Sequence, residues 1–163
     1  MAKQKEEKTN VMRVLEQKNI AFTAHTYPHD EGDPVDGVSV ANFLNRDPET
    51  VFKTLVARGA SNAIYVFDIP VADNLDLKKA AKAVGEKSIA MIHLKELLPL
   101  TGYVHGGCSP IGMKKQFPTV FHETAEILDT IMVSAGKIGY QVELEPQTLI
   151  DLVGATTADL VTD

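Results

Sequence analysis

Apolar residues recur at helical or strand spacing along nearly the whole chain, in short segments separated by polar turns. Near the start, Val11 and Leu15 share one face of a helix that the pattern predicts over residues 10–19. Asn10 is expected to cap this helix, because a side-chain amide oxygen can accept from an unpaired N–H of the first turn. The chain therefore opens with an amphipathic helix that needs a core to cover.

Strand patterns dominate the rest of the sequence. Residues 20–27 alternate apolar and polar positions, which predicts a half-buried strand. Residues 54–58 and 64–69 are two apolar runs on either side of a turn at residues 59–62, and together they predict a hairpin. Further strands are expected at residues 88–92, 119–121, 130–134 and 140–144, and a short edge segment at residues 158–161.

Local start and stop signals place the remaining helices. Asp76 precedes an alanine-rich helix that ends at Gly85, a residue suited to the left-handed C-cap. The tripeptide at residues 47–49 combines an aspartate N-cap with proline at the first helical position. Other short helices are expected at residues 38–44, 93–98 (ending before Pro99) and 147–153. This mixture predicts an α+β fold, a curved mixed sheet or barrel surrounded by helices.

Composition limits the classes of protein. The chain has 163 residues, 44% of them hydrophobic, which suits one domain over residues 10–163 after a solvated tail at residues 1–9. A single cysteine excludes an internal disulfide framework, and no apolar run approaches the ~18 residues of a membrane span. We therefore expect a cytoplasmic protein without a membrane partner. The net charge of −6 argues against nonspecific coating of nucleic acid.

Residues 101–119, TGYVHGGCSPIGMKKQFPT, concentrate glycine and proline more than any other segment. Glycine allows close approach of a ligand to the main chain, and a loop with exposed N–H groups suits a polar or anionic ligand. Lys114 and Lys115 add positive charge beside it. The alternative is a tight connector between two strands that simply needs glycine.

Side-chain chemistry gives fewer signals. The five histidines and Cys108 have no metal-site spacing, so no metal and no cofactor are expected. Cys108 with His105 as base is a candidate nucleophilic pair, although no third group evidently orients the histidine. Lys53 stands where a helix start meets an apolar strand. It could extend to solvent or project into a cavity and hold a carbonyl or phosphate, and periodicity leaves both open.

Five segments together resemble the YbaK/EbsC family in their order and spacing. They are HTYPHD (residues 25–30), DPETVFKTLV (47–56), LDLKKAAKAVG (75–85), the glycine loop at 101–119 and VSAGKIGYQVEL (133–144). Members of this family are free-standing aminoacyl-tRNA deacylases related to the editing domain of bacterial prolyl-tRNA synthetase. The resemblance implies removal of a wrong amino acid from tRNA, most typically cysteine from tRNA for proline and also from tRNA for cysteine. Formally this is a lyase or a hydrolase reaction.

The resemblance also implies a set of site residues. Lys53 matches the family's functional lysine, and no cofactor or metal is implied. The matching substrate-binding positions are Tyr27, Gly106, Gly107, Ser109, Pro110, Gly112, Ser134 and Gly136. Cys108 falls on the variable position of the G-G-x-S-P loop, which argues against a protein thiol as nucleophile.

One departure keeps alternatives open. Gln141 stands where the family commonly has aspartate, so it is a candidate specificity residue. A deacylase for another small amino acid, or a noncatalytic module that binds a tRNA end or an aminoacyl adenylate, remains compatible with the sequence. Aminoacyl-tRNA is the expected partner, and prolyl-tRNA synthetase a second one. For a cysteine substrate, the resemblance implies that the substrate's own thiol attacks its ester.

Overall fold

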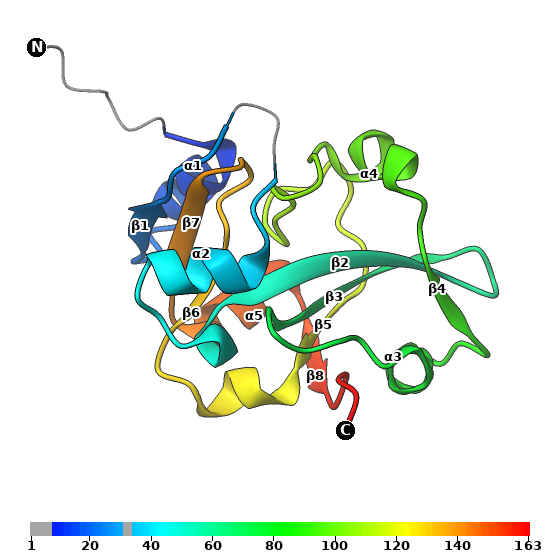
Figure 1. The fold of residues 1–163 in the computed structure, drawn as a ribbon. Coiled ribbons are helices and arrows are strands. Elements are labelled where there is room, and N and C mark those ends of the chain that lie inside the picture. Colours follow the sequence, from blue (N-terminus) through cyan, green and yellow to red (C-terminus); the bar gives the residue numbers. More distant parts are fainter. Residues whose placement is uncertain (1–7, 31–33) are drawn as a thin grey trace, which may run out of the picture.

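The computed structural model describes residues 8–30 and 34–163 as a mixed α+β fold, so most of the predicted N-terminal tail, residues 1–7, lies outside the described part (Figure 1). The predicted fold class is confirmed. The helices are α1 (Asn10–Gln17), α2 (Gly37–Phe43), α3 (Leu77–Val84), α4 (Leu94–Thr101) and α5 (Pro146–Val153), with 3-10 turns η1 (Pro48–Thr50) and η2 (Glu123–Ile127). The strands are β1 (Thr23–Thr26), β2 (Phe52–Gly59), β3 (Ile64–Pro70), β4 (Ile89–Met91), β5 (Thr119–His122), β6 (Ile131–Ser134), β7 (Tyr140–Leu144) and β8 (Thr156–Ala158).

The strands divide into two sheets. The larger sheet has the order β4-β2-β3-β5-β8, in which β5 runs parallel to both β3 and β8 and the other pairs are antiparallel. The smaller sheet, β1-β7-β6, is wholly antiparallel. An isolated bridge between Val51 and Met132 joins the start of β2 to β6. Figure 1 shows the result: β2 extends from the small sheet to β4 and is the longest strand of the molecule.

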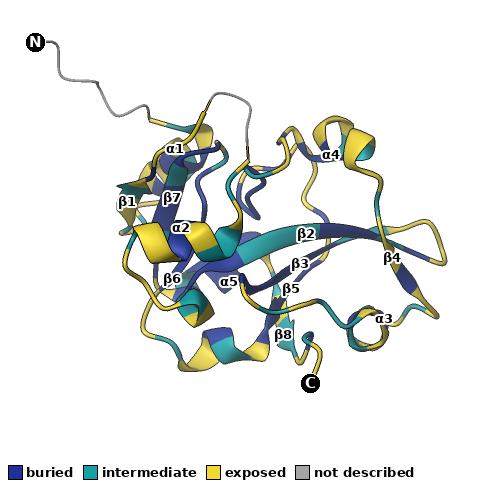
Figure 2. Cartoon of the chain, in the orientation of Figure 1, coloured by how far each residue is buried: buried dark blue, intermediate teal, exposed yellow. Residues whose placement is uncertain are grey.

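The main hydrophobic core lies between the sheets and beneath the glycine loop. Val11 and Leu15 of α1 are fully buried in it, as their predicted helical face requires. Phe52 and Val56 of β2 join the same cluster from the larger sheet. Buried residues line both sheets in Figure 2, whereas the outer turns of the helices are exposed. Burial of this apolar stripe is the main stabilising contribution that α1 makes.

Two predictions near the N-terminus are wrong. Thr9, not Asn10, caps α1: the Thr9 hydroxyl accepts from the Met12 N–H at 3.2 Å. The strand expected at residues 20–27 forms only at Thr23–Thr26, and three of its four residues are exposed. It is an edge strand that pairs with β7 alone, while the apolar Phe22 packs against the core from the segment before it. The alternation of apolar and polar residues over 20–27 therefore includes the segment before β1, which is buried in part but does not form a strand.

Two further elements have boundaries other than the predicted ones, and one element was not predicted. Helix α4 continues through Pro99 and ends at Gly102, whose left-handed backbone (φ 85°) forms the C-cap. Proline lacks a donor but can remain in a short helix when the following residues still close the last turn, as the Gly102 N–H does by donating to the Leu98 carbonyl. The last strand lies at Thr156–Ala158, parallel to β5, and the residues beyond it contribute only a Leu75–Val161 bridge. The 3-10 turn η2 has no counterpart among the predicted elements.

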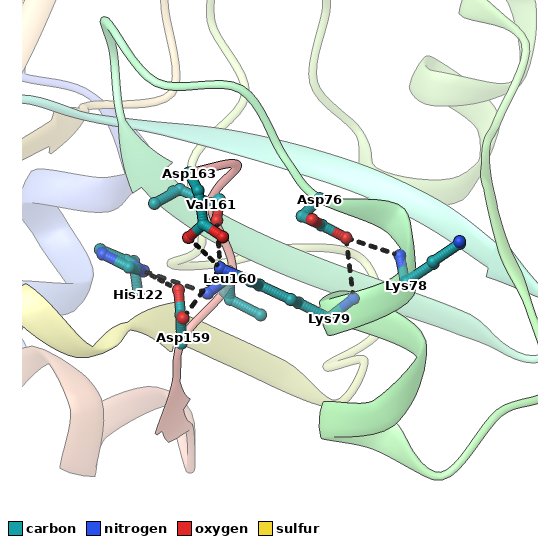
Figure 3. Close-up of polar contacts among 8 residues, drawn as sticks. All are labelled: Asp76, Lys78, Lys79, His122, Asp159, Leu160, Val161 and Asp163. Atoms are coloured by element: carbon teal, nitrogen blue, oxygen red, sulfur yellow. Dashed lines mark hydrogen bonds and ion pairs between the residues drawn. The ribbon is translucent and has the colours of Figure 1, made fainter.

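A polar cluster fastens the C-terminal segment to α3 (Figure 3). The Lys79 ammonium donates to Asp159 at 2.9 Å, to Asp163 at 3.1 Å and to the Val161 carbonyl at 2.8 Å. The buried His122 accepts from the Leu160 N–H through Nδ1 at 3.1 Å. These contacts hold the end of the chain against α3 and β5, and none of these residues lines the cavity described below.

The described residues contain neither a membrane-spanning helix nor a cluster of metal-binding side chains. No helix in residues 8–30 and 34–163 is long and apolar enough to cross a membrane. In the same ranges, no three His, Cys, Asp or Glu side chains are grouped closely enough to hold a metal ion.

Candidate functional site

A cavity of about 520 Å³ lies between the first half of β2, helix α2 and the glycine loop. Its volume falls within the range typical of sites for small ligands. Of the predicted site residues, five line it: Tyr27, Lys53, Gly106, Ser134 and Gln141. Residues from four separate segments of the chain are thus brought to one cavity.

Strand β2 contributes its edge to the cavity. Five consecutive residues, 51–55, line the wall. A sheet that presented one face would contribute every second residue, because successive side chains point to opposite faces. The unbroken run, which begins one residue before β2, therefore indicates that the cavity follows the side of the strand.

Lys53 is the cation at this edge. Its side chain is half-buried, and burial lowers the pKa of the ammonium, an effect that the charge of Asp73 opposes. No carboxylate of the described residues lies within ion-pair distance of its Nζ. A cation that is partly removed from water and unpaired gains from an anionic or carbonyl ligand.

Most of the glycine loop does not face the cavity. Gly106 lines it, but the Gly107 N–H donates to the Val104 carbonyl at 3.0 Å. Ser109 is fully buried, and its hydroxyl accepts from the Ile111 N–H at 3.2 Å. The predicted residues outside the cavity wall are Gly107, Ser109, Pro110, Gly112 and Gly136. Their contact with substrate stays a prediction. The loop follows α4 and leads into β5, with residues 107–111 buried, so it is not the connector between two strands that the sequence left open.

The small sheet supplies polar groups at the opposite wall. The Tyr27 N–H donates to the Gly139 carbonyl at 2.9 Å, which fixes the tyrosine beside β7. Ser134 Oγ accepts from the Gly136 N–H at 3.1 Å. Gln141 is 7% exposed, and its Oε1 has no hydrogen-bond partner among the described residues. A buried amide oxygen of this kind is costly unless a ligand or water satisfies it.

Two buried side chains that can lose a proton lie at this site: Cys108, which lines the cavity, and Asp68, which is not part of its lining. Burial and then the charge of Asp68 raise the pKa of the Cys108 thiol to about 12, so the thiol is protonated at neutral pH. Burial raises the pKa of Asp68 itself to about 8, although the Thr54 hydroxyl donates to its Oδ1 at 2.6 Å. No hydrogen bond joins Cys108 to His105 in the described structure, so the candidate nucleophilic pair is not assembled.

Sequence patterns did not single out several residues that line the cavity. Among them are Asp36, which caps α2 by accepting from the Ser39 N–H, and Thr54, the residue after Lys53. Leu97 of α4 adds an apolar wall. The Thr54–Asp68 contact joins two strands across the sheet, and only a correct β2–β3 register could have indicated it.

A family model for the aminoacyl-tRNA editing domain matches residues 35–152 of the chain. A curated relative from Enterococcus faecalis (strain ATCC 700802 / V583) is 45% identical over 163 residues, which is 99% of each chain. That relative is named EbsC, a candidate Cys-tRNA(Pro)/Cys-tRNA(Cys) deacylase.

Solved structures show the same fold. A crystal structure of a candidate trans-editing enzyme for prolyl-tRNA synthetase superposes with a TM-score of 0.80 at 23% identity, covering 97% of this chain and 100% of that one. A crystal structure of hypothetical protein APE2540 superposes with a TM-score of 0.82 at 20% identity, covering 93% of this chain and 99% of that one. Together, the extent of the domain match and the full-length identity show that the chain belongs to the aminoacyl-tRNA editing domain family, as its resemblance to YbaK/EbsC predicted.

Proposed function

We propose that this chain is a trans-editing aminoacyl-tRNA deacylase that removes cysteine from tRNA for proline, and with it from tRNA for cysteine. The relative that is 45% identical over 99% of both chains is named for these two substrates. The observation that carries the proposal is the cavity along β2, which combines Lys53, a cation with no carboxylate partner among the described residues, with polar groups from the small sheet. An ester with an amine at one end and a ribose phosphate at the other suits such a lining.

Lys53 is the residue that we assign to the reacting ester. In this proposal its ammonium holds the ester carbonyl or the terminal phosphate and so fixes the aminoacyl group against the wall of the cavity, and the position of Lys53 in the cavity lining supports this role. The half-buried position strengthens this contact, because surrounding water screens it less.

The nucleophile in this proposal comes from the substrate. The cysteine thiol attacks its own ester carbonyl, the bond to the ribose oxygen breaks, and that oxygen takes up the thiol proton. The products are a thiolactone and free tRNA. Cys108 is unsuited to this role, because burial keeps its thiol protonated and no base is bonded to it.

We further propose that selection of the tRNA depends on a partner, with prolyl-tRNA synthetase as the first candidate, in the cytoplasm. The chain carries a net charge of −6, so it offers few cations for the many phosphates of a tRNA. A synthetase that releases mischarged tRNA would supply the missing contacts.

The direct test is deacylation of a panel of charged tRNAs by the purified full chain. We expect release of cysteine from Cys-tRNA(Pro) and Cys-tRNA(Cys), and recovery of a thiolactone instead of free cysteine in the first seconds. Ser-tRNA(Pro), which differs by oxygen for sulfur, is the matched control and should be stable. Equal release of serine would contradict the thiol mechanism, and no release from any member of the panel would favour a binding module.

A further inference from the structure

The two edges of strand β2 are occupied differently. On the β3 side, the Val51 carbonyl accepts from the Val71 N–H at 2.9 Å, and the Gly59 N–H donates to the Ala63 carbonyl at 2.9 Å. The antiparallel register between these points pairs Lys53 with Ile69. Hydrogen-bonded pairs recur every second residue in such a ladder. The odd-numbered residues of β2 therefore direct their N–H and C=O groups to β3, and the even-numbered ones direct theirs to the opposite edge.

That opposite edge is paired only at its two ends. Toward its C-terminal half, the Val56 carbonyl accepts from the Ile92 N–H at 3.3 Å, and the pairing with β4 begins at Ala57. At the other end, Val51 forms its bridge with Met132. Thr54 lies between these contacts, and no strand in the described part of the chain pairs with its N–H or C=O. The cavity occupies the place where a partner strand would lie.

We propose that the backbone of Thr54 is the docking position for the aminoacyl group, which binds as a one-residue β-strand. The Thr54 N–H donates to the ester carbonyl, and the Thr54 C=O accepts from the α-ammonium. One α-amino acid carries both groups on either side of its Cα, as the opposite residue of an antiparallel hydrogen-bonded pair does. This inference rests on the proposed function, since it takes the ligand to be an aminoacyl ester.

Such pairing determines where the substrate side chain lies. Directly opposed residues of an antiparallel pair project their side chains from the same face of the sheet. On that face of β2 the Thr54 hydroxyl is held by Asp68 at 2.6 Å, and Leu97 and Cys108 line the cavity and belong to the adjacent core. An L-amino acid with a small side chain fits this position. Its D-enantiomer would direct the side chain to the other face, from which Lys53 projects.

The test is amide hydrogen exchange by NMR on the ¹⁵N-labelled full chain. The probe is 3′-L-alanylamino-3′-deoxyadenosine, in which a stable amide replaces the ester and no thiol can react. At saturation, the Thr54 amide should exchange at least tenfold more slowly. The amides of Lys53 and Leu55 are the matched internal controls, because β3 already protects them, and they should change less than twofold. The D-alanyl analogue, and the propionyl analogue that lacks the amine, should bind at least tenfold more weakly.

Two results would overturn the inference. In one, the L-analogue competes with substrate but leaves exchange at Thr54 unchanged. In the other, the chain deacylates Cys-tRNA(Pro) while the analogue fails to bind at millimolar concentration. Both leave the proposed function standing, because the deacylation panel tests it independently.

Discussion

The glycine loop and the edge of β2 both border the cavity, but their backbone groups differ in how far the protein itself satisfies them. In the loop, the N–H groups of Gly107, Ile111 and Lys114 donate to Val104, Ser109 and Thr101 within the protein. At the strand edge, the Thr54 N–H and C=O have no strand to pair with among the described residues. The glycine loop is thus partly satisfied internally, although the N–H groups of Gly106 and Cys108, which line the cavity, have no hydrogen-bond acceptor among the described residues. An ordinary strand adds a second set of backbone groups without a partner strand.

The glycines of the loop are explained by close packing. A Cβ on Gly106 would lie 2.6 Å from Pro34 Cβ, and Gly106 also has a positive φ of 88°. A Cβ on Gly107 would lie 3.1 Å from the Ile138 nitrogen. Concentrated glycine therefore marks a place where chain segments touch, and this does not require that a ligand touches them too.

The largest effect that we expect concerns Asp68, behind the strand edge. Its pKa is about 8 in the fold and near 3.8 in the unfolded chain, so the folded state binds the extra proton between these values. The contribution of Asp68 to stability should be most favourable below about pH 4, fall as pH rises toward 8, and level off above it. At about 1.4 kcal/mol per pKa unit the total loss is on the order of several kcal/mol.

Urea unfolding of wild type and Asp68→Asn between pH 5 and pH 9 would check this. The neutral amide has no proton to lose, so the free energy of unfolding of the variant should increase relative to that of wild type as pH rises. Parallel stability curves for the two proteins would show that Asp68 is not buried as an acid.

The next effect concerns packing of the loop. Gly107→Ala should reduce the free energy of unfolding by about 1–3 kcal/mol, because the added methyl group meets the backbone at Lys137 and Ile138, which cannot rotate away. Deacylation per folded molecule should change little, since the Gly107 N–H is already bonded to Val104. Thermal melting and active-site titration separate the two quantities. If Gly107→Ala keeps its stability but loses activity, the loop contacts the substrate and this prediction is wrong.

A smaller effect is expected at Cys108. Cys108→Ala and Cys108→Ser should deacylate Cys-tRNA(Pro) within about threefold of wild type, because the protein thiol is protonated and the substrate supplies its own. The measurement is the single-turnover rate at pH 7. A loss of a hundredfold, about 2.7 kcal/mol of transition-state stabilisation, would show that the protein thiol reacts.

The smallest expected effect is that of salt. The few lysines near the cavity imply few phosphate contacts, so the affinity of the isolated chain for tRNA should fall only shallowly with salt concentration. Fluorescence titration between 50 and 200 mM salt measures the slope. Tight binding with a steep slope, without any synthetase, would mean that the chain selects tRNA by itself.

The elements that sequence predicted well are those with local signals. Asp76 caps the start of α3 and Gly85 its end, as predicted. Asp47 caps the 3-10 turn η1, which begins at Pro48. The hairpin of β2 and β3 was predictable from the turn at residues 59–62 between two apolar runs. These features depend on a few neighbouring residues, so one sequence is enough to identify them.

Nonlocal features were not predictable in the same way. The division into two sheets depends on which strands pair, and Asp68 gives no sign of its burial until β3 is placed against Thr54. Lys53 was singled out by resemblance, since strand periodicity left both of its orientations open. A free backbone edge leaves no side-chain signature, so the docking position at Thr54 became visible only with the register.

The most direct test of the account is the activity of Lys53→Ala on Cys-tRNA(Pro). Loss of a charge-assisted contact costs about 1.5–3 kcal/mol, so we predict roughly ten- to hundredfold slower deacylation, with only partial recovery in Lys53→Arg. Lys87→Ala, which removes an exposed lysine outside the cavity, is the matched control and should keep full activity. Circular dichroism and melting should show all three variants folded. A folded Lys53→Ala variant with the wild-type rate would contradict the assignment of this cavity to the aminoacyl ester.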